Sequence, residues 1–352
     1  MFCYDITPSP GNPRNSEGAF CLTDEKELIF VYTSFRGESF EDHAHADISL
    51  MRSRDSGITW NDPELVVRYE DHGAMNIMSV SMLRMKNGDI GLFYLVRIDW
   101  LDMYVVLRRS GDGGRTWSAP HRCTRRKGYY VMNNDRAVRT SSGRIILPIA
   151  EHENSVDREG KLNFAPAKTV FFCSDDDGET FFEVCGKLYL DCPDCRSGLQ
   201  EPGVIETAQG CLYGWARTDL GRQYEFFSED NGSRWSAARP SRFTSPLSPL
   251  SMKKLNDGRF IAVWNPVPAD DRRKTDRITL GRTPLVYAVS PDQGKTWSAP
   301  RVIEDDVNSG YCYTTIFPMD DRVLTAYCAG GEKDRGCLNR LRLRVLPSAG
   351  IS

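Results

Sequence analysis

Short apolar runs separated by polar turn sequences recur along the whole chain, and no long stretch shows the 3.6-residue period of a helix. Four of these runs lead into the same kind of turn and occupy residues 103–110, 168–174, 224–228 and 285–290. Others follow a tip that contains Gly or Asp, within residues 86–95, 141–150, 208–217, 256–264 and 319–327. Period-two apolar character beside such tips is typical of antiparallel strands joined by hairpins. The pattern predicts an all-β protein.

The recurring turn is a motif of its own, Ser-x-Asp-x-Gly-x-Thr-Trp, with small departures in two of its five copies. The copies begin at Ser53, Ser110, Ser174, Ser228 and Ser290, so successive starts are 57, 64, 54 and 62 residues apart. A period of this size indicates a repeat architecture. Asp can bond nearby backbone N–H groups, Gly adopts positive φ, and Trp supplies a large apolar ring. We interpret this turn motif as scaffold, a hairpin turn with its ring packed beneath, and assign its aspartates no catalytic role.

Each repeat opens with a short segment that carries polar residues and then continues as an apolar strand. Six such openings lie at residues 15–22, 75–83, 133–139, 199–206, 245–252 and 310–317. About four strands per 50–60 residues match one blade of a propeller. Six openings therefore predict a six-bladed β-propeller, with residues 1–352 forming a single domain. The pattern leaves open which terminus supplies the strand that closes the ring.

The charge balance excludes several classes of partner. The chain has 45 basic and 48 acidic residues, a net charge of −3, and two Lys/Arg-rich runs at residues 125–127 and 272–274 that suit solvated loops. We expect no nucleic-acid partner. No apolar run approaches the ~20 residues of a membrane span, and the first fifteen residues lack the pattern of a signal peptide. We expect a cytoplasmic protein without a membrane partner, and the sequence does not indicate its oligomeric state.

The cysteine and histidine pattern gives no metal or cofactor motif. The 11 cysteines are scattered, and the pair Cys192 and Cys195 has no second pair to complete a zinc site. His43 and His45 are close in sequence but lack a defined third ligand. We therefore expect reduced thiols, no metal and no cofactor.

In a propeller the first strand of every blade lines the central channel, so the polar residues of the openings should meet on one face. They are Ser16, Glu17, Asn76, Asn134, Asp135, Arg136, Gln200, Glu201, Tyr311 and Tyr313. Later positions in the repeats add Arg36, Asp42, His43, His45, Arg217 and Arg282. Arginines that converge on one place favour an anionic ligand, because a guanidinium binds a carboxylate through two parallel hydrogen bonds. Each arginine could instead pair with a local acid.

Two kinds of side chain in this set could perform acid–base and nucleophilic chemistry. A carboxylate such as Glu201 beside Tyr311 could take the phenol proton and so activate an oxygen whose pKa is otherwise near ~10. Tyr311 could equally be an aromatic residue that stacks on a ligand. Asp42 could donate a proton to a leaving group, or be a solvated loop acid.

At this point the chain resembles the sialidase (neuraminidase) superfamily, whose members are six-bladed propellers with Asp boxes similar to the turn motif. The order of the functional positions also matches, with Arg36 before Asp42, Glu201-Pro202 before Arg217, Arg282 before the last turn motif, and Gly310-Tyr311-Cys312 after it. The resemblance covers nearly the whole chain.

The resemblance implies an exo-acting, retaining glycoside hydrolase that releases a terminal acidic sugar, sialic acid by default, from a small-molecule or oligosaccharide substrate. Tyr311 would be the nucleophile, Glu201 its proton partner and Asp42 the acid/base, as in the Tyr-dependent exception among glycosidases. Arg217 and Arg282 would hold the substrate carboxylate. Further substrate contacts are expected from Arg36, Arg136, Asp135, His43, His45, Glu17 and Tyr313.

The sequence departs from the family pattern where the first arginine of the carboxylate triad belongs. That strand reads Arg14-Asn15-Ser16-Glu17, so either Arg14 or Arg136 would replace the arm, and residues 326–329 lack the Glu that usually supports it. His43 or His45 could replace Asp42 in acid–base work. The pattern indicates a divergent branch. The alternatives are a glycosidase for a different sugar such as a uronic acid, a non-catalytic carbohydrate-binding propeller, and a purely structural propeller.

Overall fold

The computed structural model describes residues 2–267 and 277–347, which excludes the basic run 272–274. The regular secondary structure of this part of the chain is almost entirely β-strand, as the sequence predicts, with 3₁₀ turns at η1 (Tyr69–His72) and η2 (Glu332–Asp334). Within the described residues no helix is long and apolar enough to cross a bilayer.

Four of the sheets have four antiparallel strands each. The first contains β2 (Asn15–Leu22), β3 (Leu28–Phe35), β4 (Ala46–Ser53) and β5 (Glu64–Val67). The second contains β17 (Gln200–Ala208), β18 (Cys211–Arg217), β19 (Arg222–Ser228) and β20 (Arg239–Thr244). The third contains β21 (Ser251–Lys254), β22 (Phe260–Trp264), β23 (Leu285–Ser290) and β24 (Arg301–Glu304). The fourth contains β25 (Cys312–Pro318), β26 (Arg322–Cys328), β27 (Leu341–Pro347) and β1 (Cys3–Ile6).

A larger sheet of nine strands joins two such units. One unit is β6 (Asn76–Arg84), β7 (Ile90–Arg97), β8 (Met103–Ser110) and β9 (His121–Arg122). The other is β10 (Tyr129–Val131), β11 (Val138–Arg139), β12 (Ile145–His152), β15 (Lys168–Ser174) and β16 (Phe182–Glu183). The two are connected by one parallel pair, Tyr129 with Met103. A small hairpin of β13 (Ser155–Val156) and β14 (Leu162–Asn163) follows β12.

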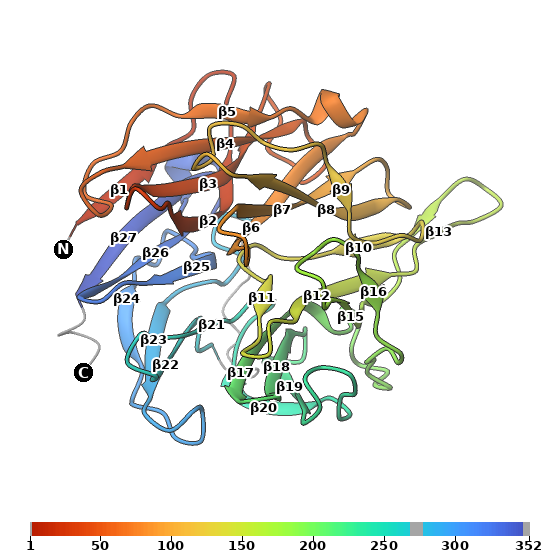
Figure 1. The fold of residues 1–352 in the computed structure, drawn as a ribbon. Coiled ribbons are helices and arrows are strands. Elements are labelled where there is room, and N and C mark those ends of the chain that lie inside the picture. The colour runs from red at the N-terminus through yellow and green to blue at the C-terminus, as the bar shows by residue number, and fades with distance from the viewer. Residues whose placement is uncertain (1, 268–276, 348–352) are drawn as a thin grey trace.

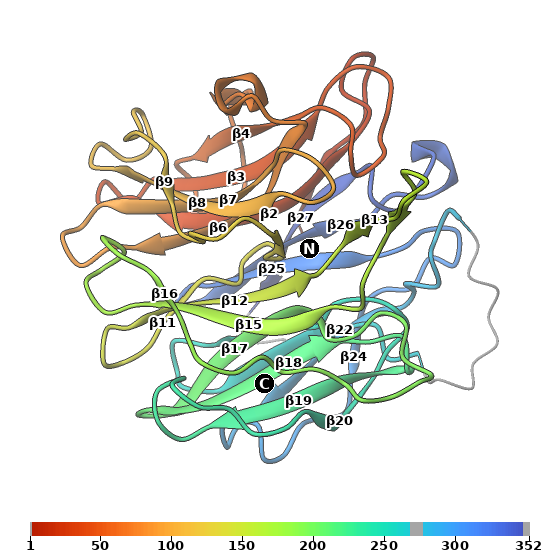
Figure 2. The same ribbon diagram turned by 90° about the vertical axis from the view of Figure 1, so that its right-hand side faces the viewer.

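The sheets follow one another around a common centre in chain order (Figures 1 and 2), with β3, β4 and β7 on one side of the molecule and β18 and β19 on the opposite side. Around that centre β2 lies against β6 and β25, and β21 lies against β17 and β25. Apolar cores fill the spaces between successive sheets, where for example Ile29 and Leu50 pack with Ile77 and Leu92. The inner strands such as β3, β7 and β22 therefore bury both faces, which explains their mostly apolar composition.

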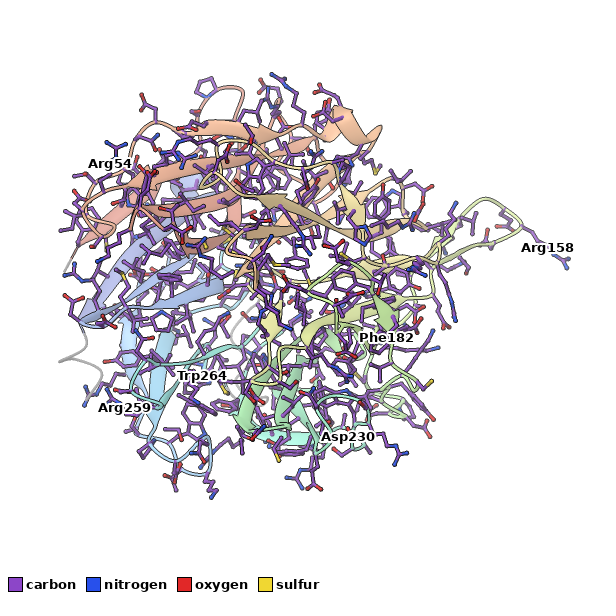
Figure 3. All side chains as sticks on the ribbon, viewed as in Figure 1. Arg54, Arg158, Phe182, Asp230, Arg259 and Trp264 are labelled. Atoms are coloured by element: carbon purple, nitrogen blue, oxygen red, sulfur yellow. The ribbon has the colours of Figure 1, made fainter. Side chains whose placement is uncertain are left out.

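The turn motif forms the hairpins between the third and fourth strands. In the first copy the Ser53 hydroxyl donates to Asp55 at 2.8 Å and accepts from the Gly57 amide at 2.8 Å, while Asp55 also accepts from the Thr59 amide and hydroxyl. The ring of Trp235 stacks on Phe171 of the preceding unit, with 4.1 Å between centroids. These bonds stay within the turn, and Figure 3 places Asp230 of another copy at the edge of the molecule. The motif thus serves as scaffold at the periphery.

The N-terminal strand joins the last sheet of the chain, a pairing that the sequence leaves open. β1 pairs antiparallel with β27 from Cys3–Arg344 to Ile6–Leu341, as the outermost strand of the sheet built from the last three strands. The β13–β14 hairpin instead projects from the body, with Arg158 at its tip (Figures 1 and 3).

Candidate functional site

A backbone irregularity at the same place in five of the openings shapes the site. Five residues there have positive φ: Glu17 (51°), Ser79 (57°), Asp135 (57°), Glu201 (46°) and Tyr313 (57°). In β2, β6, β17 and β25 the pairing register skips beside this residue. A bulge of this kind re-aims a side chain, and a non-Gly residue persists in such a conformation only where its surroundings determine it. The bulges of β2 and β6 bring Glu17 and Ser79 into contact, and those of β17 and β25 bring Glu201 and Tyr313 into contact.

The bulges of β17 and β25 bring Glu201 and Tyr313 into contact. The Tyr313 hydroxyl donates to Glu201 Oε1 at 3.0 Å. Arg217 Nη1 lies 3.0 Å from Glu201 Oε2 and 3.4 Å from the same hydroxyl, while Gln200 Oε1 accepts from its Nε and Nη2 at 3.1 and 2.5 Å. Burial, followed by the Glu201 carboxylate, raises the pKa of Tyr313 well above its usual value. The phenol therefore holds its proton at neutral pH and presents it to Glu201.

The sequence-based placement of Tyr311 beside Glu201 is wrong. Tyr311 is 2 % exposed, belongs to an apolar core cluster, and meets the ring of Tyr327 edge-on at 6.3 Å. Its side chain hydrogen-bonds Ser309, and burial raises its pKa. Tyr311 and Tyr313 are separated by the bulge, which sends the first ring into the core and the second, partly exposed ring toward Glu201.

Two further arginines lie buried in this region. The guanidinium of Arg282 sits 5.3 Å from the centre of the Tyr313 ring. Arg136 donates to Leu250 O at 2.7 Å, and burial lowers its pKa to about 10. The Nε of each is buried without a hydrogen-bond partner among the described residues. Burying a hydrogen-bond donor without a partner costs free energy, so both arginines indicate that a polar ligand binds here.

Asp135 is not aimed at the same region as Tyr313. Its carboxylate accepts from Lys253 at 2.8 Å and from the backbone N–H of Ile316 at 3.0 Å. These bonds link β21 and β25 to the segment between β10 and β11. The predicted substrate contact is therefore a structural link between sheets.

The candidate acid/base Asp42 forms an ion pair with Arg14. Arg14 Nη1 lies 2.6 Å from Asp42 Oδ1, and its Nη2 lies 3.3 Å from Glu17 Oε2. Arg14 is buried, whereas the Asp42 side chain is 62 % exposed. The partial loss of solvent around Asp42 would raise its pKa, but the nearby cations of Arg14, Arg97 and Arg282 outweigh this effect and lower the pKa. Burial raises the pKa of Glu17, which favours its neutral form beside these groups.

Three predicted substrate contacts have other neighbours. Arg36 is half exposed and pairs with the buried carboxylate of Asp47, so the structure does not bring it together with Arg217 and Arg282. His45 is exposed, stacks on Tyr69 and bonds Met75 O at 3.0 Å. His43 is exposed too, and its ring lies 5.5 Å from that of Trp100.

Sequence reasoning missed Arg97. Its Nη1 donates to the backbone oxygen of Asp42, and its guanidinium lies 5.5 Å from the ring of Trp100. The repeat gives no signal for it, because the counterpart of Arg217 in β7 is Leu95, which pairs with Met78 beside the bulge as Arg217 pairs with Gln200. Arg97 lies two residues beyond that position.

A separate cavity of about 500 Å³ lies between the sheets of β17–β20 and β21–β24. Its lining includes Tyr213, Phe243 and Trp297 and none of the residues placed above around Tyr313. This cavity is therefore separate from the residues around Tyr313.

Residues 27–325 match the model of the BNR repeat-like domain, and the chain belongs to that family. A curated relative named sialidase, from Bacteroides fragilis (strain YCH46), is 22 % identical over 338 residues. The match covers 86 % of this chain, which spans only 57 % of the length of that relative.

Solved structures of sialidases have a similar fold. The Hadza microbial sialidase Hz136 superposes with a TM-score of 0.73 at 17 % identity, over 97 % of this chain and 67 % of its own. The leech intramolecular trans-sialidase, solved with 2,7-anhydro-Neu5Ac, gives 0.72 at 13 % identity, over 99 % and 70 %. Identities this low establish the fold alone, and the chain is sialidase-like in that sense.

Proposed function

We propose that this protein is an exo-acting, retaining glycoside hydrolase that releases a terminal acidic sugar, sialic acid by default, with Tyr313 as its nucleophile. The observation that carries the proposal is the 3.0 Å hydrogen bond from the Tyr313 hydroxyl to Glu201, with Arg217 beside both groups. A carboxylate within this distance can take the phenol proton as the oxygen attacks. A lectin has no need of such a pair.

In the first step the Tyr313 oxygen attacks the anomeric carbon, its proton passes to Glu201, and the glycosidic bond breaks. The departing oxygen takes a proton from Asp42, which leaves a glycosyl-tyrosine intermediate. In the second step Asp42 removes a proton from water, the water oxygen attacks the anomeric carbon, the bond from that carbon to the Tyr313 oxygen breaks, and Glu201 returns its proton to that oxygen. Two displacements retain the anomeric configuration.

The arginines explain a preference for an anionic sugar. Arg217 and Arg282 flank Tyr313, and Arg14 would supply the third cation once the substrate carboxylate replaces Asp42 as its partner. Releasing Asp42 from Arg14 would raise the pKa of Asp42 and prepare it to act as an acid. A neutral phenol also approaches a carboxylate-bearing carbon with less repulsion than a carboxylate nucleophile would.

We also infer that the fold is a six-bladed propeller. The nine-stranded sheet contains two units joined at a single residue pair, Tyr129 with Met103. Dividing it there and setting the small β13–β14 hairpin aside gives six sheets of comparable size, and the turn motifs then correspond to Asp boxes in five of them.

A panel of aryl glycosides tests the function. It contains a sialoside, the methyl ester of the same sialoside, a uronide and a neutral hexoside. We expect turnover of the sialoside with retention, followed by NMR of the first-formed anomer. The ester should lose about 100-fold in kcat/KM, since it gives up charge-assisted hydrogen bonds of roughly 1.5–3 kcal/mol. Equal turnover of the hexoside would refute the arginine argument.

Two other outcomes select the alternatives. Preferential turnover of the uronide indicates a glycosidase of the same mechanism for a different acidic sugar. Binding of free sialic acid in calorimetry without turnover of any glycoside indicates a carbohydrate-binding protein.

A further inference from the structure

Arg282 is a buried cation without a carboxylate partner among the described residues. Its side chain is close to the Tyr313 ring and its residue is 6 % exposed. Its Nη1 donates to Cys312 Sγ at 3.0 Å, its Nη2 donates to Leu247 O at 3.1 Å, and its Nε has no partner. A buried charge needs a counter-ion or dense hydrogen bonding. Two described atoms accept hydrogen bonds from this guanidinium, the carbonyl oxygen of Leu247 and the sulfur of Cys312.

That sulfur belongs to a buried cluster of three thiols. Cys312 of β25 lies directly opposite Cys328 of β26, and Cys337 from the loop before β27 completes the cluster. All three residues are at most 1 % exposed. The side chains of Cys328 and Cys337 both pack beside Cys312 in this cluster. One buried sulfur thus accepts a hydrogen bond from a guanidinium and has two further thiols beside it, an arrangement that suits an anion.

The backbone around the cluster is closely packed. A Cβ on Gly310 would lie 2.6 Å from the Cβ of Cys337, and one on Gly330 would lie 2.2 Å from Gly336 O. Only glycine fits at these two positions, so the loop that carries Cys337 lies tightly against the segments before β25 and after β26.

We propose that Cys312 is a permanent thiolate, the buried counter-ion that holds Arg282 beside Tyr313. Burial opposes ionisation, but the two thiol donors and Arg282 outweigh it and lower the pKa of Cys312 well below its usual value. The pKa values of Cys328 and Cys337 are raised, so the cluster carries one negative charge. Cys123, equally buried but without such donors, has a raised pKa.

A thiolate suits this place better than a carboxylate would. A single large sulfur atom engages one edge of the guanidinium and leaves Nε free, whereas a carboxylate would pair with two nitrogens. Cys312 is therefore a positioning residue that acts through Arg282. Its effect on substrate binding rests on the proposed function, but its charge does not.

Ultraviolet difference absorbance of the full chain tests the charge, because thiolates absorb where thiols do not. At neutral pH, Cys312→Ser should lose the absorbance of about one thiolate per chain, given one cysteine ionised among protonated thiols. Cys123→Ser is the matched buried control and should leave the spectrum unchanged. Cys337→Ala keeps Cys312 but removes a donor. As the pH is lowered, the thiolate absorbance of this variant should disappear at a higher pH than that of the parent. Parent-like spectra for Cys312→Ser and Cys337→Ala would overturn the proposal.

Kinetics with the aryl sialoside test the positioning role. Cys312→Ser should raise KM about tenfold with a smaller effect on kcat, as expected from the loss of one charge-assisted bond to Arg282. Cys312→Asp restores an anion of similar size and should return KM to within about threefold of the parent, a tolerance of well under 1 kcal/mol. An unchanged KM in a folded Cys312→Ser that has lost its thiolate signal would refute the role. If the chain hydrolyses no acidic glycoside, the proposed function fails while the absorbance still decides the charge.

Discussion

The pair Tyr313→Phe and Tyr311→Phe separates two tyrosines that lie two positions apart in sequence but in different surroundings. Removing the Tyr313 hydroxyl deletes the proposed nucleophile together with its 3.0 Å bond to Glu201. We expect kcat on an aryl sialoside to fall at least about 10³-fold, which corresponds to roughly 4 kcal/mol of barrier. Arg217 still neutralises Glu201, so the fold should tolerate the change.

Tyr311→Phe is the matched control because it removes the same atom from a tyrosine two residues earlier, directly before β25. The Tyr311 ring stays in its apolar cluster and loses only the hydrogen bond to Ser309. A net cost of about 1 kcal/mol should lower Tm by about 1–2 °C in a chain of this length, with kcat unchanged. Steady-state kinetics and thermal unfolding of both variants decide the matter. Loss of turnover in Tyr311→Phe with full activity in Tyr313→Phe would refute the assignment.

The remaining predictions concern the other groups. Glu201→Gln should reduce kcat about 10²–10³-fold with little change in KM, since it removes the proton acceptor, and a larger change in KM than in kcat would contradict that role. Asp42→Asn should slow alkyl sialosides far more than nitrophenyl ones, because only poor leaving groups need a proton; equal slowing would count against the acid role. Asp176→Asn should cost about 1 kcal/mol at neutral pH, comparable to a lost helix cap. The Thr180 hydroxyl and amide hold the pKa of Asp176 at about 2, below its unfolded value near ~3.9, so this stabilisation is present above about pH 4 and lost toward pH 2. The difference in Tm between parent and variant should therefore shrink across that window, and a constant difference would contradict the argument.

The strands and turns could be predicted because their signals are local. The turn motif satisfies its own hydrogen bonds, as Ser53, Asp55 and Thr59 do, so its residue types alone specify it. The pairing of β1 (Cys3–Ile6) with β27 could not be predicted, because it depends on where the last sheet ends in space. The first strand after β9 is likewise split into β10 and β11, and nothing in the apolar pattern marks the break at Asp135.

The error at Tyr311 has a physical cause that also shows how to avoid it. Local sequence context favours Tyr311 of Gly310-Tyr311 as the site residue. It does so because a Tyr with φ of 57° is rare, and no residue propensity predicts a bulge at Tyr313. Comparison of the repeats does predict the bulge. An apolar residue follows each bulge residue three positions later, and these apolar residues are Phe20, Met82, Val138, Val204 and Ile316.

Alignment of the openings on that apolar position places Tyr313, not Tyr311, level with Glu201. The same alignment places Pro249 at the equivalent position of the fifth opening, where the proline ring fixes a negative φ and excludes the bulge conformation. The same backbone irregularity thus occurs in five of the six openings and is absent from the fifth, which carries Pro249. The position of the bulge, rather than the adjacent residues in the sequence, decides which side chain reaches the centre. A residue of this chain is therefore best compared with its counterparts in the other repeats.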